Sequence, residues 1–497
     1  MNRNNIWIRV GIAVILITIA AVLGQIDRWR AALKDDPIVK NGEAVSKAIS
    51  HPRRPELLVR FKPGVSLDRI RRIASANHDV LADEIESVSG LSVIDDLDDA
   101  DPDTVARAYA SMTDAVLYAE PNTTISLDCP DHELDVASAR PDGDVHYRDL
   151  LYRYEFGATG DRLVKEIPND PQFEEQWALN NIGQEGGKDR ADIDALEAWQ
   201  TTTGSEDVVV AVLDTGVDFT HVDLVNNMWI RPENVPAYTD DELGTFNDIN
   251  GYNGTDTIAD PMDDNGHGTH CAGIIGAEGD NGEGIAGINW HVKIMPLKFL
   301  GRGGFGSVDD AIEAINYAID RKEHRVNVRV ISASWGSTMK SKALEDTIRA
   351  AGDAGILFVA AAGNDASNND RRPHYPSNYD LPNVISVAAL DRNDQLGGFS
   401  NFGAMTVHIA APGKDILSTW LNGDYREASG TSMATPYVSG VAALIVANEP
   451  DITMEKLRDR ILKTADKLDS LDGKVATGGR VCAANALAGR VLNHLQH

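Results

Sequence analysis

The sequence predicts an α/β fold with a mainly parallel sheet, preceded by a small α+β unit. Five apolar, β-branched runs lack polar alternation, as strands buried on both faces require; they cover residues 208–213, 292–297, 328–332, 356–361 and 384–389. Helical stretches separate them, such as residues 308–319, which Ser307 opens with Asp309 and Asp310 in the first turn. Alternating strands and helices indicate a parallel sheet.

The small unit comes first in the chain. Residues 57–61 predict a strand, residues 67–76 an amphipathic helix and residues 115–118 a returning strand. Residues 127–167 show no sustained period and carry clustered Asp, Arg and Gly, which predicts an exposed linker open to cleavage. The strand–helix alternation then defines a second domain over residues 168–497.

The N-terminus predicts export from the cytoplasm. Arg3 and Arg9 precede an apolar run over residues 10–23, and polar residues follow it. This length suits a secretory signal and is short for a membrane span. We therefore expect residues 1–24 to be a signal peptide, with an uncleaved signal-anchor as the alternative.

Charge and cysteine content narrow the partners. The 497 residues include 76 acidic and 46 basic ones, for a net charge of −30, so nucleic acids and anionic membranes are poor partners. The favoured interpretation of this acidity is a solubility surface; a saline habitat and calcium-rich loops are alternatives. Cys129, Cys271 and Cys482 cannot form a disulfide framework, and Cys271 is interpreted as a small buried hydrophobe.

Four polar residues follow or open these elements. Asp214 ends one apolar run, Asn364 follows another, and His267 lies between two glycines before an apolar stretch. Ser432 precedes Pro436 and the apolar run 437–447, which predicts a helix with proline in its first turn. A serine nucleophile needs a base and a group that orients the base. Singly, each residue also fits a cap or a satisfied histidine; together they predict an acyl-transfer site beyond the strand ends.

The order Asp, His, Ser and the motifs Asp214-Thr-Gly, His267-Gly-Thr-His270 and Gly-Thr-Ser432-Met-Ala-Thr-Pro resemble the subtilase (subtilisin-like) serine peptidases. The resemblance covers residues 169–492 and implies a three-layer α/β/α domain. It implies Asp214 as orienting acid, His267 as base and then acid, and Ser432 as the nucleophile that forms an acyl-enzyme. Asn364 and the Ser432 amide would bind the oxyanion. On a helix that starts at His267, His270 lies about 300° around, so we expect it to be structural.

The same resemblance implies the residues that hold a substrate. Two segments would flank an extended peptide as antiparallel neighbours: Ser334, Trp335 and Gly336, and Gly304, Phe305 and Gly306. Without the family, the glycine-rich loop is equally well a flexible turn. Gly363 would line the S1 pocket and His374 would lie near its floor. Trp335 stands where the family commonly has leucine, so pocket width is open; we expect large apolar or aromatic P1 residues.

Structural calcium is the implied cofactor. Calcium needs several oxygens on bent loops, and the resemblance assigns one site to Asp170, Asp223, Asn281, Glu283 and Ile285. A solvated acidic turn is the alternative. A second site would use Asn253, Asp256 and Asp260, although Ile258 occupies a position where the pattern favours an acidic residue.

Residues 50–126 resemble the subtilase propeptide through Leu58-Val-Arg-Phe-Lys-Pro63 and Leu117-Tyr-Ala-Glu-Pro-Asn122. The resemblance implies a ferredoxin-like unit that acts as intramolecular chaperone and inhibitor, with autocleavage within residues 123–168. The predicted function is a secreted, calcium-stabilised serine endopeptidase, monomeric, acting on proteins and peptides. Alternatives are a membrane-anchored processing protease of narrow specificity, an inactive binding module, and an esterase or amidase.

Overall fold

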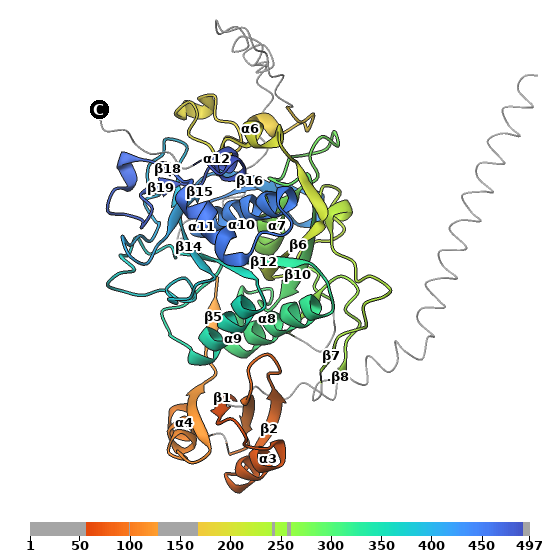
Figure 1. Cartoon of the computed structure of the whole chain (residues 1–497), viewed down its shortest axis with the longest axis vertical. Helices are drawn as coiled ribbons and strands as arrows, with labels where there is room; N and C mark the ends of the chain where they lie inside the picture. The colour runs from red at the N-terminus through yellow and green to blue at the C-terminus, as the bar shows by residue number, and fades with distance from the viewer. Residues whose placement is uncertain (1–55, 99, 128–166, 241–243, 256–259, 491–497) are drawn as a thin grey trace, which may run out of the picture. The chain divides into compact units, whose positions relative to one another are not determined.

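The computed structural model describes residues 56–98, 100–127, 167–240, 244–255 and 260–490 (Figure 1). The predicted signal segment, nearly all of the predicted linker, Cys129 and Asp256 lie outside these residues. Within the described ranges, no helix combines the length and apolar character that a membrane crossing requires.

The front unit is an antiparallel sheet with two helices. Its elements are β1 (Glu56–Phe61), α3 (Leu67–Ala76), β2 (Asp79–Glu84), β3 (Leu91–Asp96), α4 (Pro102–Ala110) and β4 (Val116–Pro121). The order along the chain is β-α-β-β-α-β, and the strands lie in the order β2-β3-β1-β4. Leu57, Val59 and Phe61 pack with Ile70 and Tyr109. Alternate residues of one strand therefore bury the inner faces of both helices.

A nine-stranded sheet forms the second domain, in the order β18-β19-β15-β14-β13-β12-β6-β10-β9. Its strands are β6 (Gly204–Asp214), β9 (Tyr252–Asn253), β10 (His291–Lys298), β12 (Val328–Ala333), β13 (Leu357–Ala361), β14 (Val384–Leu390), β15 (Ile409–Pro412), β18 (Asp466–Lys467) and β19 (Gly479–Arg480). All neighbours pair in parallel except β18 and β19. The predicted parallel α/β class is confirmed, and every predicted run lies in a strand except for Ile356.

Helices cover both faces of this sheet. On one side lie α8 (Val308–Glu323) and α9 (Lys342–Asp353), and on the other α7 (His267–Gly276) and α10 (Thr431–Asn448) (Figure 1). In β6, Val208, Val210 and Val212 pack into the core beside α7 and α10, while Val209, Ala211 and Leu213 pack into the core beside α8 and α9. Because both faces are buried, the strand is a continuous apolar run.

Shorter elements complete the described chain. They are β5 (Thr124–Ser126), α6 (Ala195–Trp199), β7 (Thr239–Asp240), β8 (Gly244–Thr245), β11 (Phe305–Ser307), β16 (Ile416–Thr419), β17 (Tyr425–Ala428), α11 (Met454–Lys463) and α12 (Ala483–Ala488). Single 3-10 turns cover Phe173–Glu175, Gln184–Gly186, Val225–Asn227, Leu421–Gly423 and Asp469–Leu471.

Two predicted helix starts have different outcomes. Helix α8 begins after Ser307 as predicted, and Ser307 forms a capping box with Asp310. Helix α10 begins at Thr431, so Pro436 is its sixth residue and the expectation of a first-turn proline is wrong. An interior proline deprives the carbonyl four residues earlier, that of Ser432, of its helical donor. The Ser334 hydroxyl supplies a donor at 2.8 Å instead, which explains how the helix accommodates this proline.

Candidate active site

The carboxylate of Asp214 and the imidazole of His267 meet at the carboxyl end of β6. Asp214 is the last residue of that strand and is fully buried. His267 is the first residue of α7, and its Nδ1 lies 2.8 Å from Asp214 Oδ1. The Thr215 amide donates to the same oxygen at 2.7 Å. The carboxylate is thus held in a position that selects the Nδ1–H tautomer of the imidazole and leaves Nε2 as the basic nitrogen.

The loop before His267 is shaped by Asp263, a residue that the sequence pattern did not single out. Its carboxylate accepts hydrogen bonds from the amides of Asn265, Gly266 and Thr269 at 2.9–3.0 Å. Gly266 has a φ of 110°, and a Cβ there would lie 2.5 Å from the Trp420 ring. Because the N-cap position of α7 is Gly266 and not Asp263, no capping signal in the sequence points to this role.

His270, the second histidine of the motif, is turned into the core. It is fully buried, and its Nε2 lies 3.1 Å and 3.0 Å from the carbonyl oxygens of Ile416 and Arg426. Burial lowers its pKa to about 4, so the ring is neutral near pH 7. It joins α7 to β16 and β17 and is a structural residue.

Asn364 and the Ser432 amide face one small space. Asn364 follows β13 by three residues, and its Oδ1 accepts from the amide and the hydroxyl of Thr431 at 2.8 Å and 3.1 Å. A Cβ placed on Gly430 would lie 3.4 Å from Asn364 Nδ2 and 3.5 Å from the Ser432 nitrogen. The two nitrogens are therefore close together, as the two donors of the predicted oxyanion hole require.

Ser432 is the second residue of α10 and only 2% exposed. Its hydroxyl donates to the Ser334 carbonyl at 3.1 Å. The Cys271 thiol of α7 lies 3.5 Å from the Ser432 carbonyl, and Asp214, His267 and Cys271 offer atoms that lie within 4.8 Å of one another. The helices that carry His267 and Ser432 therefore pack against each other beside Asp214. Burial raises the pKa of the Cys271 thiol, which fits a small neutral core residue.

The two predicted substrate-flanking segments hold a strand of the front unit between them. Strand β5 pairs antiparallel with β11, with Ile125 opposite Gly306 and Ser126 opposite Phe305. Ser126 also forms an antiparallel bridge with Gly336, and the amide of the next residue, Leu127, donates to the Gly304 carbonyl at 2.9 Å. Residues 124–127 therefore lie extended between both edges.

Of the residues predicted to form the substrate pocket, His374 packs beside two of the predicted backbone segments, whereas the Trp335 side chain lies in the core. A Cβ on Gly336 would lie 2.0 Å from the His374 ring and one on Gly363 would lie 3.0 Å from it, so the buried ring packs against both backbones. The Trp335 side chain is fully buried; it donates to the Leu213 carbonyl at 2.8 Å and packs on Phe299. It lies in the core and lines no open pocket, so only its backbone can flank a substrate.

The first predicted calcium set is gathered around one loop. Asp170 accepts from the Asp280 amide at 2.7 Å, and Asp223 accepts from Asn281 Nδ2 and the Ile285 amide, both at 2.9 Å. Within the described chain, Asp170 Oδ1 is buried and accepts no hydrogen bond. Burial raises the pKa of both Asp170 and Asp223 to about 6. The Glu283 amide donates to Asn281 Oδ1 at 2.7 Å, which bends the loop.

The second predicted set is only partly described. Asn253 Nδ2 donates to the Asp260 carbonyl at 2.9 Å, and its Oδ1 accepts from the amide and hydroxyl of Thr255. These two predicted ligands are close together, but the Asn253 oxygen already serves a local turn. Asp256 lies outside the described residues.

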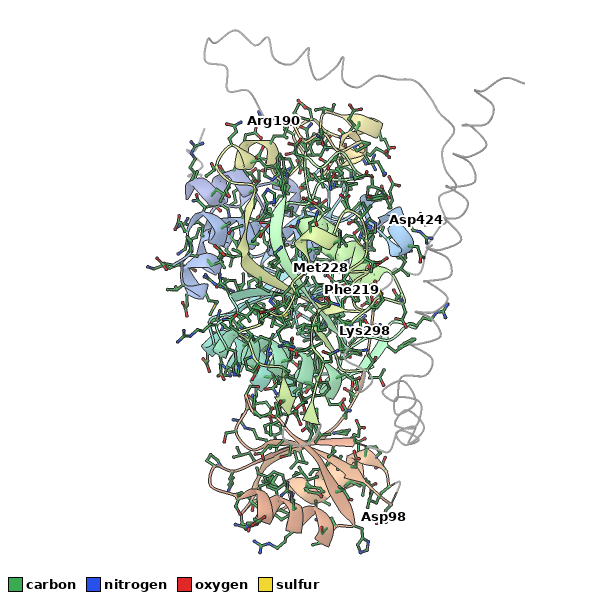
Figure 2. All side chains as sticks on the ribbon, turned by 90° about the vertical axis from the view of Figure 1, so that its right-hand side faces the viewer. Asp98, Arg190, Phe219, Met228, Lys298 and Asp424 are labelled. Carbon is green, nitrogen blue, oxygen red and sulfur yellow. The ribbon has the colours of Figure 1, made fainter. Side chains whose placement is uncertain are left out.

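Lys298, labelled in Figure 2, is a further residue that the sequence pattern did not reveal. It ends β10 and is 4% exposed. Its ammonium donates to the Thr215 carbonyl and to Asp264, both at 2.6 Å. It therefore braces the turn that follows Asp214.

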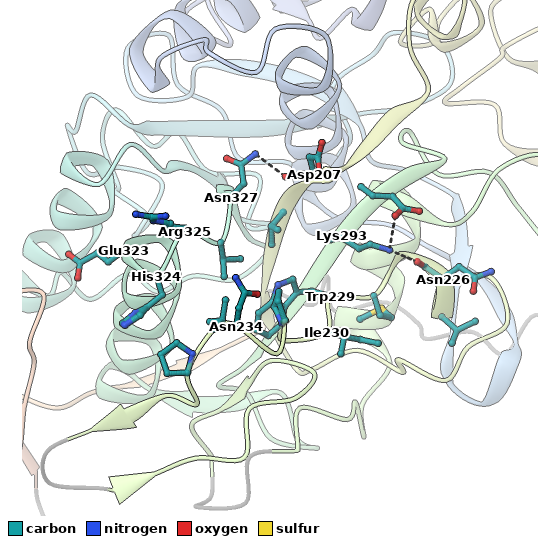
Figure 3. Close-up of a pocket in the computed structure, with 18 residues that line it drawn as sticks. Asp207, Asn226, Trp229, Ile230, Asn234, Lys293, Glu323, His324, Arg325 and Asn327 are labelled. Atoms are coloured by element: carbon teal, nitrogen blue, oxygen red, sulfur yellow. Dashed lines mark hydrogen bonds and ion pairs between the residues drawn. The ribbon is translucent and has the colours of Figure 1, made fainter.

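A separate groove of about 970 Å³ opens at the opposite edge of the sheet (Figure 3). It is lined by residues at or before the amino ends of β6, β10 and β12, including Asp207, Lys293 and Asn327. Asn327 donates to the Asp207 carbonyl at 2.8 Å, and Lys293 donates to the Asn226 carbonyl at 2.7 Å. In parallel α/β sheets, sites lie at the carboxyl ends of strands, so this groove is distinct from the site at Asp214.

A parallel α/β sheet with a carboxylate, an imidazole and a hydroxyl gathered at one edge defines the class of α/β serine peptidases. The family model described as "Subtilase family" matches residues 205–480. The chain belongs to the subtilase family and is a serine endopeptidase.

Known proteins match about two thirds of this chain. A thermophilic serine proteinase from Bacillus sp. strain AK1 is 36% identical over 337 residues, which are 65% of this chain and 75% of that protein. Thermitase from Thermoactinomyces vulgaris is 35% identical over 320 residues, 64% of this chain and 99% of that protein. A solved protease structure from Pseudoalteromonas arctica PAMC 21717 is 30% identical, with a TM-score of 0.54, and covers 65% of this chain and 99% of that one.

Proposed function

We propose that the chain is the zymogen of a secreted, calcium-stabilised endopeptidase that removes its own front unit. The observation that carries this proposal is strand β5 with the following Leu127, held between β11 and Gly336. A peptidase that binds its substrate as an added strand uses main-chain hydrogen bonds for affinity and side-chain pockets for specificity. The extended conformation of residues 124–127, between the two segments predicted to flank a substrate, supports this proposal.

The proposed reaction uses four residues. The Ser432 hydroxyl turns from the Ser334 carbonyl to His267, which takes its proton as the oxygen attacks the scissile carbonyl. Asp214 keeps the imidazole oriented and stabilises the imidazolium. The oxyanion receives hydrogen bonds from Asn364 Nδ2 and the Ser432 amide. His267 then protonates the leaving amine, and water hydrolyses the acyl-enzyme by the same steps.

Contacts at two helix starts support an inhibitory and templating role for the front unit. Glu120 accepts from the Ser341 hydroxyl and from the amides of Lys342 and Ala343, at 2.6–3.0 Å, and so caps α9. Asn122 accepts from the Asp309 amide at 3.2 Å, in the first turn of α8. Capping satisfies the free amides of a helix start. Helices and distant strands of a large sheet assemble slowly without such a template.

The strand register also narrows the predicted processing interval of residues 123–168. Leu127 still bonds to the substrate-flanking edge. We therefore propose that the first cut falls in the bonds immediately after Leu127, with later trimming of the predicted linker. A preference for large apolar P1 residues in other substrates remains a prediction.

Calcium fits the first predicted site. Asp170 Oδ1 is a buried oxygen without a donor, and the raised pKa values of Asp170 and Asp223 reflect burial of two nearby carboxylates. Asp170, Asp223 and Asn281, with the loop carbonyls of Glu283 and Ile285, would hold the ion. The bound ion would supply the positive charge that these carboxylates lack and would stabilise the loop.

The test is the Ser432→Ala chain expressed in a protease-free host. We expect it to accumulate as an uncleaved precursor, whereas the parent and a surface control, Ser111→Ala, yield a mature form. N-terminal sequencing of the first product should place the cut just after residue 127. A fluorophosphonate probe should label the parent and not Ser432→Ala. Normal processing of Ser432→Ala would contradict self-maturation, and absence of labelling in the parent would favour an inactive binding module.

A further inference from the structure

Three buried carboxylates meet where the front unit contacts the peptidase domain. Asp83 belongs to β2 of the front unit, Asp240 to β7 and Glu313 to α8. Their side chains are 4%, 1% and 7% exposed. Each offers one oxygen, and these three atoms lie within 4.8 Å of one another. None of the predicted calcium ligands is among them.

Two of these side chains lack hydrogen-bond donors. Both oxygens of Asp83 and both oxygens of Glu313 are buried and accept no hydrogen bond of ordinary geometry from another group, although the two carboxyl groups are near enough to share a proton and the Glu84 amide is near enough to favour the Asp83 carboxylate. Buried acceptors in proteins are almost always paired. Two side chains that are more than nine-tenths buried, point into one cluster and lack donors indicate a missing positive partner.

Two other buried carboxylates of this chain have that partner. Asp248 lies 2.9 Å from Arg231 and 3.1 Å from Arg321. Asp394 likewise pairs with Arg480 and Lys188. Among the described residues, no ion pair reaches Asp83 or Glu313. Because an uncompensated buried charge is strongly destabilising, the cluster needs either a cation or shared protons.

The surroundings add negative charge. Burial, followed by the charges of Asp240 and Glu86, raises the pKa of Asp83 to about 7. Burial and then Asp83 raise the pKa of Glu313 well above its usual range. Glu86 is itself tied to α8, since Asn316 donates to it and accepts from the Ser87 amide at 3.0 Å. The front unit therefore brings two carboxylates against a helix that carries a third.

We propose that Asp83, Asp240 and Glu313 form a calcium site that joins the front unit to the peptidase domain. Carboxylate oxygens are hard ligands, which calcium prefers, and oxygens bound to one calcium ion at opposite positions are about 5 Å apart. The observed separations meet that limit. The ion supplies the charge that this cluster lacks and links β2 across the contact to β7 and α8.

The site then exists only while the front unit is in place. Removal of the front unit would take away Asp83. The ion would then keep only Asp240 and Glu313 of its three proposed carboxylate ligands. Calcium would therefore retain the front unit on the enzyme until that unit is degraded. This consequence rests on the proposed role of the front unit, whereas the metal site does not.

The experiment counts calcium ions in the Ser432→Ala chain, which stays intact. The protein is stripped with a chelator and titrated calorimetrically with calcium chloride at neutral pH. We expect Glu313→Gln to bind one calcium ion fewer per chain than its Ser432→Ala parent. Glu323→Gln, an exposed substitution on the same helix, should bind as many as the parent. Asp223→Asn should lose a different ion, so the two losses should add in the double variant.

Asp83→Asn provides a second variant, and circular dichroism of each protein verifies folding. Metal-free Glu313→Gln should melt no lower than its parent because it removes a buried repulsion. Unchanged calcium stoichiometry in both Glu313→Gln and Asp83→Asn would overturn the proposal and assign the cluster to shared protons. This count does not depend on self-processing, because no variant in the comparison carries the Ser432 hydroxyl.

Discussion

Ser432 and Ser334 form two reciprocal hydrogen bonds, each from the hydroxyl of one residue to the carbonyl of the other. The Ser432 hydroxyl donates to the Ser334 carbonyl at 3.1 Å, and the Ser334 hydroxyl donates to the Ser432 carbonyl at 2.8 Å. The second bond replaces the one that Pro436 cannot make. The start of α10 is therefore tied to the end of β12, next to Gly336, which bridges to Ser126. Proline within the helix therefore frees a carbonyl that fixes Ser432, the proposed nucleophile, beside the edge that holds residues 124–127.

Replacing Asn364 by alanine tests the oxyanion assignment. The Asn364 amide is anchored through Oδ1 by Thr431, so its N–H group is already oriented before charge develops on the substrate. We expect kcat to fall by about 10²–10³-fold, or roughly 3–4 kcal/mol, with little change in KM, because removing an asparagine donor of the same role from a subtilisin has an effect of this size. Steady-state kinetics on a chromogenic peptide provide the measurement.

Asn393→Ala, in an exposed turn, is the matched control and should leave both constants unchanged. If Asn364→Ala instead raised KM at constant kcat, Asn364 would bind the ground state and the assignment would be wrong.

The candidate catalytic residues could be predicted because each lies in a local sequence motif. The residues that hold them in place could not, because they come from distant parts of the chain. Asp214, His267, Asn364 and Ser432 each follow or open an element whose apolar pattern is visible in the sequence. Lys298 supports the turn at Thr215 from another strand, 83 positions away. A contact between residues so far apart in the sequence cannot be predicted from a local motif. The same limit applies to Trp335, because sequence alone did not reveal that its ring enters the core.

At the level of elements, strands were easier to predict than helix starts. A strand that is buried on both faces must be apolar throughout, so β6, β10, β12 and β14 follow directly from the sequence. The start of α10 does not, because proline favours a first turn and the compensating Ser334 hydroxyl comes from the end of β12. The caps of α8 and α9 by Asn122 and Glu120 come from the front unit and were not visible either.

Glu120→Ala tests how strongly the front unit is held by the start of α9. The substitution removes three acceptor contacts, including two to helix amides. In the Ser432→Ala precursor we expect a loss of about 1–2 kcal/mol of stability, as for other N-cap deletions, measured as a lower midpoint in urea.

Asp114→Ala is the control, because its ion pair with Arg69 is exposed and contributes little. An equal loss in both variants would argue against the cap. An enzyme that has lost the front unit, as proposed, has no such interaction to lose.

For the whole molecule, the net charge of −30 is only partly a surface property. Asp83, Asp240 and Glu313 are buried at the contact between the front unit and the peptidase domain. A second carboxylate pair lies at the same contact, since Asn122 Nδ2 donates both to Glu56 and to Asp309 of α8. Several carboxylates are therefore buried at this contact. If the acidic residues served solubility alone, they would all be exposed to water.

This arrangement gives precursor stability a pH dependence of definite sign. Burial, and then the charge of Asp309, raises the pKa of Glu56 from 4.5 to about 8. A carboxyl whose pKa is higher in the folded state binds more protons folded than unfolded between these two values. Its stabilising contribution is therefore complete below pH 4.5 and is lost as the pH rises through about 8. Asp83 acts in the same direction, with a pKa raised to about 7.

Glu56→Gln isolates this effect in the Ser432→Ala precursor, kept in chelator so that bound calcium does not mask it. Glutamine resembles the protonated glutamic acid and cannot ionise, so the two proteins should melt at similar temperatures near pH 4.5. As the pH rises toward 8, the parent should lose stability relative to Glu56→Gln, and the difference in melting temperature should widen steadily. Differential scanning fluorimetry between pH 4.5 and 8 measures this difference in melting temperature.

Glu455→Gln, an exposed substitution in α11, is the control and should melt at the same temperature as the parent at every pH. A Glu56→Gln curve parallel to the parent would show that Glu56 ionises freely at the contact and that its burial does not set the pH dependence of precursor stability.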